Sequence, residues 1–119
     1  MVRCLDSQDL QELSTGSLQS FEKQIALIPA DLCAPFHAAA GRLESQLLTI
    51  YQMVVLCTKK EEDLDKLALW WSSMVRVCDE FITHLEGLVK QHPQCGVEYY
   101  RDRFLDVRNT CERLQELHN

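Results

Sequence analysis

The chain has 119 residues, of which 46% are hydrophobic and 25% charged, a balance typical of a folded globular domain rather than of a disordered or fibrous chain. Its net charge of -6 argues against binding to nucleic acid or to an anionic membrane surface, because both need clustered Lys and Arg. No apolar run approaches the roughly 20 residues that span a bilayer, so we expect one domain over residues 1–119 without membrane insertion.

The first predicted helix, about residues 6–28, has the weakest pattern. Its apolar positions recur at helical spacing: Leu10, Leu18, Phe21, Ile25 and Ile28. The run Ser14-Thr15-Gly16-Ser17 allows either a continuous helix or a break at Gly16 with a new N-cap, since small hydroxylated residues bond the first free amides of a helix. Pro29 ends the segment in both cases.

The second and third predicted helices, about 35–57 and 60–91, carry regular stripes of alternating three- and four-residue spacing. The second stripe is Phe36, Ala40, Leu43, Leu47, Ile50, Val54 and Cys57. The third is Leu64, Leu67, Trp71, Met74, Cys78, Phe81, Leu85 and Leu88. Pro35 suits the first turn of a helix, and Thr58 followed by Glu61 has the form of a capping box for the third helix. His92 and Pro93 end that helix.

A fourth predicted helix, about 96–118, completes the chain. Its stripe is Val97, Tyr100, Phe104, Val107, Cys111 and Leu114. The three connections between predicted helices are short, and short links favour antiparallel neighbours. The sequence therefore predicts an all-α fold, a four-helix up-and-down antiparallel bundle.

Six cysteines leave two interpretations of the compartment open. Cys57, Cys78 and Cys111 lie on apolar stripes, where a free thiol behaves as a small buried hydrophobe. The first residues lack the apolar core of a signal peptide, so we expect the cytosol or nucleus, where thiols stay reduced. The alternative is a secreted protein in which the off-stripe Cys4, Cys33 and Cys95 are joined in disulfides. These two compartments imply different functions.

No residue pattern predicts catalysis, a cofactor or a metal site. The four glycines are scattered singly, and no nucleophile elbow, phosphate loop or dinucleotide fingerprint occurs. His92 and Cys95 have the spacing of a zinc-ligand pair, but a zinc site needs four ligands and no second close pair exists. Glu80 and His84 are one helical turn apart, which predicts a surface ion pair. We expect a protein that is not an enzyme.

The second and third helices carry more apolar surface than a narrow helix seam needs. One interpretation is that both lie centrally in the bundle and contact two neighbours each. The other is that the off-stripe residues form a face for a partner, because exposed apolar patches mark interaction sites and Trp and Tyr are enriched in binding hot spots. The predicted partner-binding residues are Leu48, Val55, Leu56, Trp70, Val77 and Tyr99.

These features predict a non-catalytic protein-protein interaction module, an adaptor or a subunit of an intracellular complex. Its partner would be an amphipathic helix or a second copy of the chain. The alternative, from a different class, is a secreted four-helix signalling protein of the cytokine type with disulfides. The number of free thiols distinguishes the two hypotheses.

Overall fold

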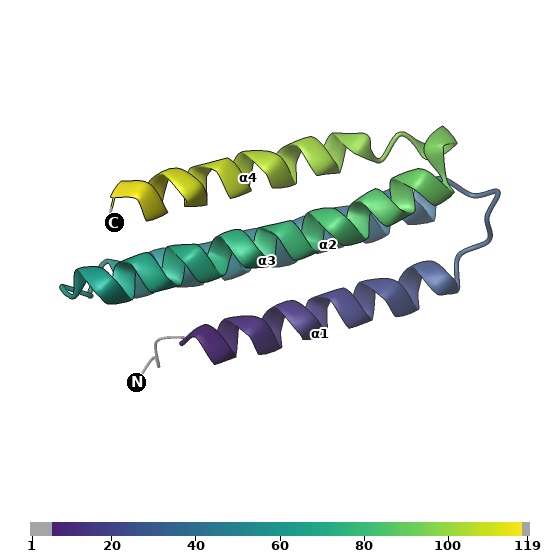
Figure 1. Ribbon diagram of the computed structural model, residues 1–119. Helices are drawn as coiled ribbons and strands as arrows, with labels where there is room; N and C mark the ends of the chain where they lie inside the picture. The colour runs from purple at the N-terminus through teal and green to yellow at the C-terminus, as the bar shows by residue number, and fades with distance from the viewer. Residues whose placement is uncertain (1–5, 118–119) are drawn as a thin grey trace.

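The computed structural model describes residues 6–117 and contains four long helices (Figure 1). In chain order these are α1 (Ser7–Ala26), α2 (Ala34–Thr58), α3 (Leu64–Gln91) and α4 (Glu98–Leu117), with a short 3-10 helix, η1 (Pro93–Cys95), before α4. Consecutive long helices run in opposite directions (Figure 1). The predicted all-α up-and-down bundle is therefore confirmed.

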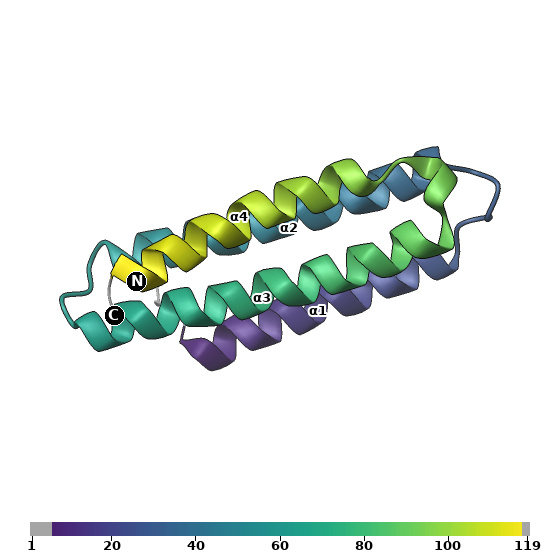
Figure 2. The same ribbon diagram turned by 45° about the horizontal axis from the view of Figure 1, so that its top comes forward.

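The helices do not form a ring in chain order. Both α1 and α4 pack against α2 and α3, and within residues 6–117 α1 and α4 do not contact each other. Figure 2 shows α4 alongside α2 and α1 alongside α3, and each of these pairs is parallel. The Cα atoms span 51 × 29 × 16 Å, so the bundle is flat. Because α2 and α3 each have three neighbours, much of their wide apolar surface is used inside the bundle.

The predicted stripes meet in one core that runs between all four helices. Phe36, Phe81 and Phe104 are its largest fully buried side chains, and the rings of Phe81 on α3 and Phe104 on α4 meet edge to face with centroids 6.2 Å apart. Edge-to-face packing favours such pairs beyond the apolar area that they bury. The buried cysteines Cys57, Cys78 and Cys111 belong to the same interior, as their stripe positions predict.

Helix α1 continues through Gly16 without a break, which settles the alternative that the sequence left open. Leu10 and Ser14, on the N-terminal side of the glycine, are fully buried, so packing holds this half of the helix in place. Asp6 caps the helix: its carboxylate accepts from the Asp9 amide at 2.8 Å, and the Asp9 carboxylate accepts from the Asp6 amide at 3.1 Å. These bonds satisfy amides that have no partner inside the helix.

The predicted start of the third helix is wrong by one turn. Thr58 is the last residue of α2, and its hydroxyl donates to the Val55 carbonyl instead of capping α3. Helix α3 begins at Leu64, with the Asp63 carboxylate accepting from the Asp65 amide. The stripe prediction for Leu64 is also wrong, since this side chain is 61% exposed in the first turn at the end of the bundle.

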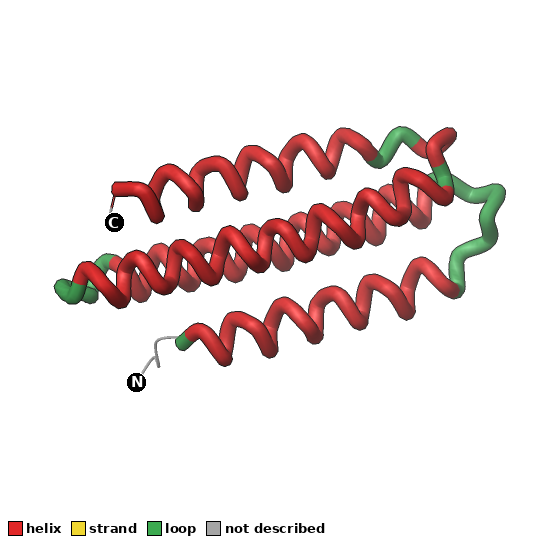
Figure 3. Tube along the Cα trace, in the orientation of Figure 1, coloured by secondary structure: helices red, strands yellow, loops and turns green. Residues whose placement is uncertain are grey.

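The connections gather at two ends of the molecule (Figure 3). The hairpin end holds the 59–63 connection, the start of α1 and the end of α4. The disulfide end holds the connections 27–33 and 92–97, which are joined by a disulfide between Cys33 and Cys95 with Cα atoms 5.0 Å apart. The expectation that these two cysteines stay reduced is wrong; Cys4 lies outside the described residues.

Further contacts order the disulfide end. The Phe36 and His92 rings stack with centroids 4.2 Å apart, and a His37 ring nitrogen hydrogen-bonds to the Cys95 carbonyl. Gly96 has a φ of 70°, a left-handed conformation that glycine adopts without a steric penalty, and it redirects the chain from η1 into α4. Because Cys95 is held in the disulfide, it is not a zinc ligand.

Candidate interaction surface

The six predicted partner-binding residues do not lie in one patch. Val77 is 2% exposed and belongs to the core, so its predicted place on a binding surface is wrong. Trp70 and Val55 are half-buried and pack against the core, and Leu48 is half-buried as well. The remaining two, Leu56 and Tyr99, are well exposed. The exposed fraction alone therefore divides the six predicted residues into one core residue, three half-buried residues and two exposed residues.

The flank of α3 that carries Trp70 and Val77 faces α1. The Ser7 and Ser73 hydroxyls hydrogen-bond at 3.2 Å, and the buried Ser14 hydroxyl donates to the Glu80 carboxylate at 3.1 Å. Both pairs are 66 residues apart in sequence, as expected for two parallel helices in register. Helix α1 thus occupies most of the flank for which the sequence predicted an external partner helix.

The predicted surface ion pair between Glu80 and His84 is replaced by other contacts. The His84 Nδ1 atom lies 2.8 Å from the Glu80 main-chain carbonyl, and Nε2 lies 3.8 Å from the Glu22 carboxylate on α1. The Glu80 carboxylate meanwhile accepts from Ser14. Both side chains face the neighbouring helix, so they stabilise the packing of α1 on α3.

The off-stripe flank of α2 faces α4. Leu48 lines a small depression of about 170 Å³ with Phe104 and Val107 of α4. Val55 lies seven residues further along the same side of α2 and packs against the core. This flank is a seam between helices.

Tyr99 lies at the disulfide end, far along the bundle from Leu56. Its hydroxyl accepts a hydrogen bond from Arg103 at 3.2 Å, and the Arg103 guanidinium carbon lies 5.5 Å from the centroid of its ring. Arg103 also pairs with Glu44 of α2. The hydrogen bond to Glu44 raises the pKa of the Arg103 guanidinium, with a smaller contribution from Tyr99. Tyr99 therefore supports a contact between α2 and α4.

Apolar side chains are exposed at the hairpin end, and we call this group the hairpin-end surface. It consists of Leu56, Leu64, Leu69 and Trp70, of which the three leucines are 56–61% exposed. Two of the four, Leu69 and Trp70, line an open depression of about 430 Å³ between the start of α1, the end of α2 and the start of α3. The depression is lined by Asp6, Ser7, Cys57, Lys60, Glu61, Lys66, Leu69 and Trp70. Two predicted residues, Leu56 and Trp70, belong to this surface.

The charged side chains around the depression differ in whether they already form contacts within the chain. The Asp6 carboxylate accepts from the Asp9 amide, and the Glu61 carboxylate accepts from the Asp63 amide at 3.1 Å. Neither Lys60 nor Lys66 forms an ion pair with any other residue in the part of the chain that the structure describes. The two ammonium groups are the charges available to a ligand here.

Sequence reasoning missed Leu64, Leu69 and the two lysines. Leu64 lies seven residues before Trp71, so its spacing places it on the buried stripe, and only the later start of α3 reveals that it is exposed. Leu69 lies between the stripe and the polar side of the helix, where a single exposed leucine is unremarkable. The relevant signal is the gathering of three chain segments at one end, which spacing within a helix does not encode.

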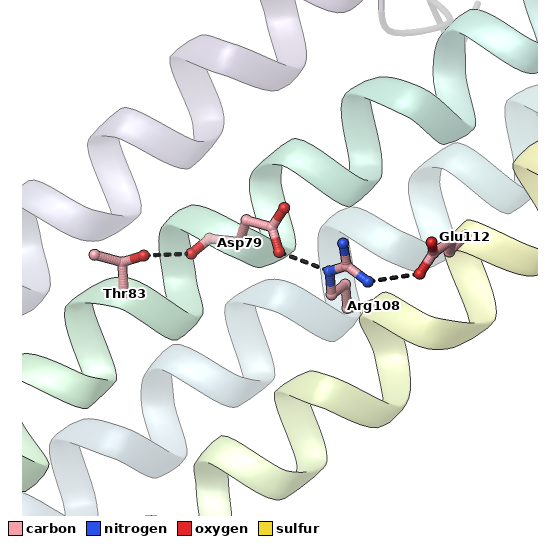
Figure 4. A network of polar contacts seen from close by, with 4 residues as sticks. All are labelled: Asp79, Thr83, Arg108 and Glu112. Carbon is pink, nitrogen blue, oxygen red and sulfur yellow. Dashed lines mark hydrogen bonds and ion pairs between the residues drawn. The ribbon is translucent and has the colours of Figure 1, made fainter.

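A polar network joins α3 and α4 on another face (Figure 4). Arg108 donates to the Asp79 carboxylate at 2.7 Å and to Glu112 at 2.6 Å, and the Thr83 hydroxyl donates to the Asp79 carbonyl at 2.9 Å. The hydrogen bond to Asp79 is the main cause that raises the pKa of the Arg108 guanidinium. Every charge in this network has a partner, so the network links two helices and offers no acid-base pair.

Within residues 6–117, no group of three or more His, Cys, Asp or Glu side chains is arranged to hold a metal ion. Among the described helices, none combines the length and apolar character needed to cross a bilayer. No protein-family model, no curated protein and no solved structure matches this chain. The functional argument therefore depends on the chemistry of the surfaces themselves.

Proposed function

We propose that this chain is a non-catalytic protein-protein interaction module, an adaptor or a subunit of a cytoplasmic or nuclear complex. The observation that carries this proposal is the hairpin-end surface, where the exposed Leu69 and the half-buried Trp70 line an open depression and Leu56 and Leu64 are exposed at the same end of the bundle. Large aromatic and aliphatic side chains in such positions are the usual anchors of protein interfaces. The polar clusters elsewhere cap helices or join them, so they need no catalytic explanation.

The proposed ligand is an amphipathic helix of a partner protein that carries acidic residues beside its apolar face. Apolar side chains of that helix would pack on Leu69 and Trp70, which line the depression. Its carboxylates would pair with Lys60 and Lys66, whereas Asp6 and Glu61 already accept local backbone hydrogen bonds. Complementary charge at the rim of an interface mainly adds specificity and association rate.

The test is affinity purification from the source cells with three baits compared by quantitative mass spectrometry. These are the wild type, the variant Leu69→Glu, and the control Leu27→Glu, which changes a leucine that is 85% exposed at the disulfide end. We expect a partner that the wild type and the control retain equally and that Leu69→Glu loses by at least tenfold. A partner retained equally by all three baits would contradict the hairpin-end surface.

The lysines give a second, independent variant. Replacing both Lys60 and Lys66 by Glu reverses the charge around the depression and leaves the apolar residues intact. The same partner should be weakened, and the loss should shrink as salt concentration rises, because rim charges are screened. If this variant binds as the wild type does, the acidic character proposed for the partner is wrong.

A second candidate function is a secreted four-helix signalling protein, and the Cys33–Cys95 disulfide favours it. Disulfides persist in oxidising compartments and are rare in the cytosol. Fractionation of the source cells and their medium, with the protein detected in each fraction by quantitative mass spectrometry, separates the candidates. Recovery from the cytosolic or nuclear fraction would support the intracellular module, and recovery from the medium would support the secreted protein.

A further inference from the structure

Two cysteines meet inside the core, between α3 and α4 and away from the hairpin-end surface. Cys78 on α3 and Cys111 on α4 are fully buried and carry free thiols. The two side chains lie near enough to each other for the Cys111 thiol to act on the Cys78 thiol. Two neighbouring thiols on two packed helices differ from a lone buried cysteine, because each can serve as the other's partner in a disulfide.

The neighbouring contacts hold these two positions opposite each other. Asp79 follows Cys78 directly, Arg108 lies one turn before Cys111, and their side chains are joined by the 2.7 Å hydrogen bond in Figure 4. Arg108 also bonds to Glu112, the residue after Cys111. The two helices form the closest packed pair of the bundle. The packing of α4 on α3 therefore brings the two cysteines to opposing positions.

We propose that Cys78 and Cys111 form a second disulfide when the chain folds in the presence of a small disulfide oxidant such as oxidised glutathione. One cysteine thiolate attacks a sulfur of the oxidised glutathione and forms a mixed disulfide. The S–S bond of the glutathione breaks, and one glutathione thiolate leaves and takes up a proton. The second cysteine thiolate then attacks the mixed disulfide and expels the other glutathione. Two protein thiols are oxidised, and one oxidised glutathione is reduced to two thiols.

The cross-link forms before α4 is fully packed on α3. In the folded chain neither sulfur is accessible, and the hydrogen bond to Cys111 together with burial raises the pKa of the Cys78 thiol. The thiolate is the attacking species, so both effects slow the reaction of the folded protein. The site therefore acts as a structural cross-link made during folding and does not respond rapidly to oxidants afterwards.

This inference does not depend on the partner proposed for the hairpin end. The disulfide already present joins the connections at one end of the bundle, whereas the new one would join the middles of two helices. With both formed, four of the six cysteines would be cross-linked. Helix α4 would then be unable to separate from α3.

The test is refolding of the fully reduced protein in a mixture of reduced and oxidised glutathione, followed by alkylation, trypsin digestion and mass spectrometry. Trypsin places Cys78 in peptide 77–90 and Cys111 in peptide 109–113, apart from the peptides of all other cysteines. We expect the two peptides to be recovered linked, in at least tenfold excess over their alkylated forms. Recovery of both as alkylated peptides, while Cys33 and Cys95 are linked, would overturn the proposal, as would linkage of either cysteine to a different one.

The variant Cys111→Ser is the matched control. It should abolish the 77–90 link and leave the Cys33–Cys95 link at its wild-type level. If this variant fails to fold, the peptide map of the wild type alone tests whether Cys78 and Cys111 are linked. A second measurement adds the same oxidant to reduced protein that is already folded, and the Cys78–Cys111 link should then form at least tenfold more slowly than during refolding. Equal rates would overturn the claim that the cross-link precedes packing.

Discussion

The two ends of the bundle use their residues differently. At the disulfide end, the Cys33–Cys95 bond and the stacked rings of Phe36 and His92 tie two connections together. At the hairpin end, the 59–63 connection is a turn closed by backbone hydrogen bonds, and Leu69 and Trp70 line an open depression. The disulfide end also exposes two leucines, Leu27 and Leu32, which are 85% and 46% exposed. The comparison separates groups that stabilise the fold from groups available for binding.

The largest expected effect comes from a charge placed in the core near the hairpin end. Trp71 is 3% exposed and its ring lies 6.0 Å from that of Tyr51, so Trp71→Asp buries an unpaired carboxylate and leaves a cavity. We expect a loss of at least about 4 kcal/mol in unfolding free energy, which is a large part of a total stability of about 5–15 kcal/mol. Circular dichroism during chemical denaturation measures it.

The control for that prediction is Leu69→Asp, two residues earlier on the same helix. Its side chain points toward solvent, so the new charge stays hydrated. This pair tests whether the hairpin end is a surface on a firm core or a loosely packed region. Equal destabilisation by Trp71→Asp and Leu69→Asp would show that the exposed leucines are part of the fold.

The next largest effect should come from the disulfide end. Replacing Cys33 and Cys95 by Ser removes a cross-link between residues 62 apart in sequence. The unfolded chain then gains conformational entropy, which predicts a loss of about 4 kcal/mol in unfolding free energy. The midpoint of guanidinium denaturation should fall, and reduced wild type should unfold like the double variant. If the double variant keeps the wild-type midpoint, the ring stacking and the other contacts at this end are sufficient without the bond.

A smaller effect is expected where α1 packs against α3. Ser14 is fully buried and donates to Glu80, so Ser14→Ala removes one side-chain hydrogen bond to a charged group. The expected loss is about 1–2 kcal/mol, since Glu80 remains partly accessible to water. Thr15→Ala, an exposed neighbour, is the control and should cost less than about 0.5 kcal/mol. Equal losses would mean that the hydrogen bond to Glu80 contributes nothing.

The sequence predicted the fold well because stripe spacing determines which side of each helix is buried. It failed where the answer depends on which helices become neighbours. Val77 lies off the main stripe, yet α1 covers it, and nothing in the spacing of α3 says that α1 lies there. Cys33 and Cys95 meet for the same reason, because two loops separated in sequence share one end. The sequence placed Leu64 in the core because it predicted the start of the third helix one turn too early, and that start depends on one capping residue.

The smallest expected effect on stability belongs to the exposed leucines themselves. Leu56→Asp and Leu64→Asp should each change the unfolding free energy by less than about 0.5 kcal/mol, as surface substitutions usually do. Differential scanning calorimetry of both, with Leu27→Asp at the disulfide end as the matched variant, measures these small shifts. Exposed apolar residues that contribute little to the stability of the fold are available to an interface at this end of the bundle. A loss above about 2 kcal/mol at Leu56 or Leu64 would instead assign that leucine to the fold and remove it from the hairpin-end surface.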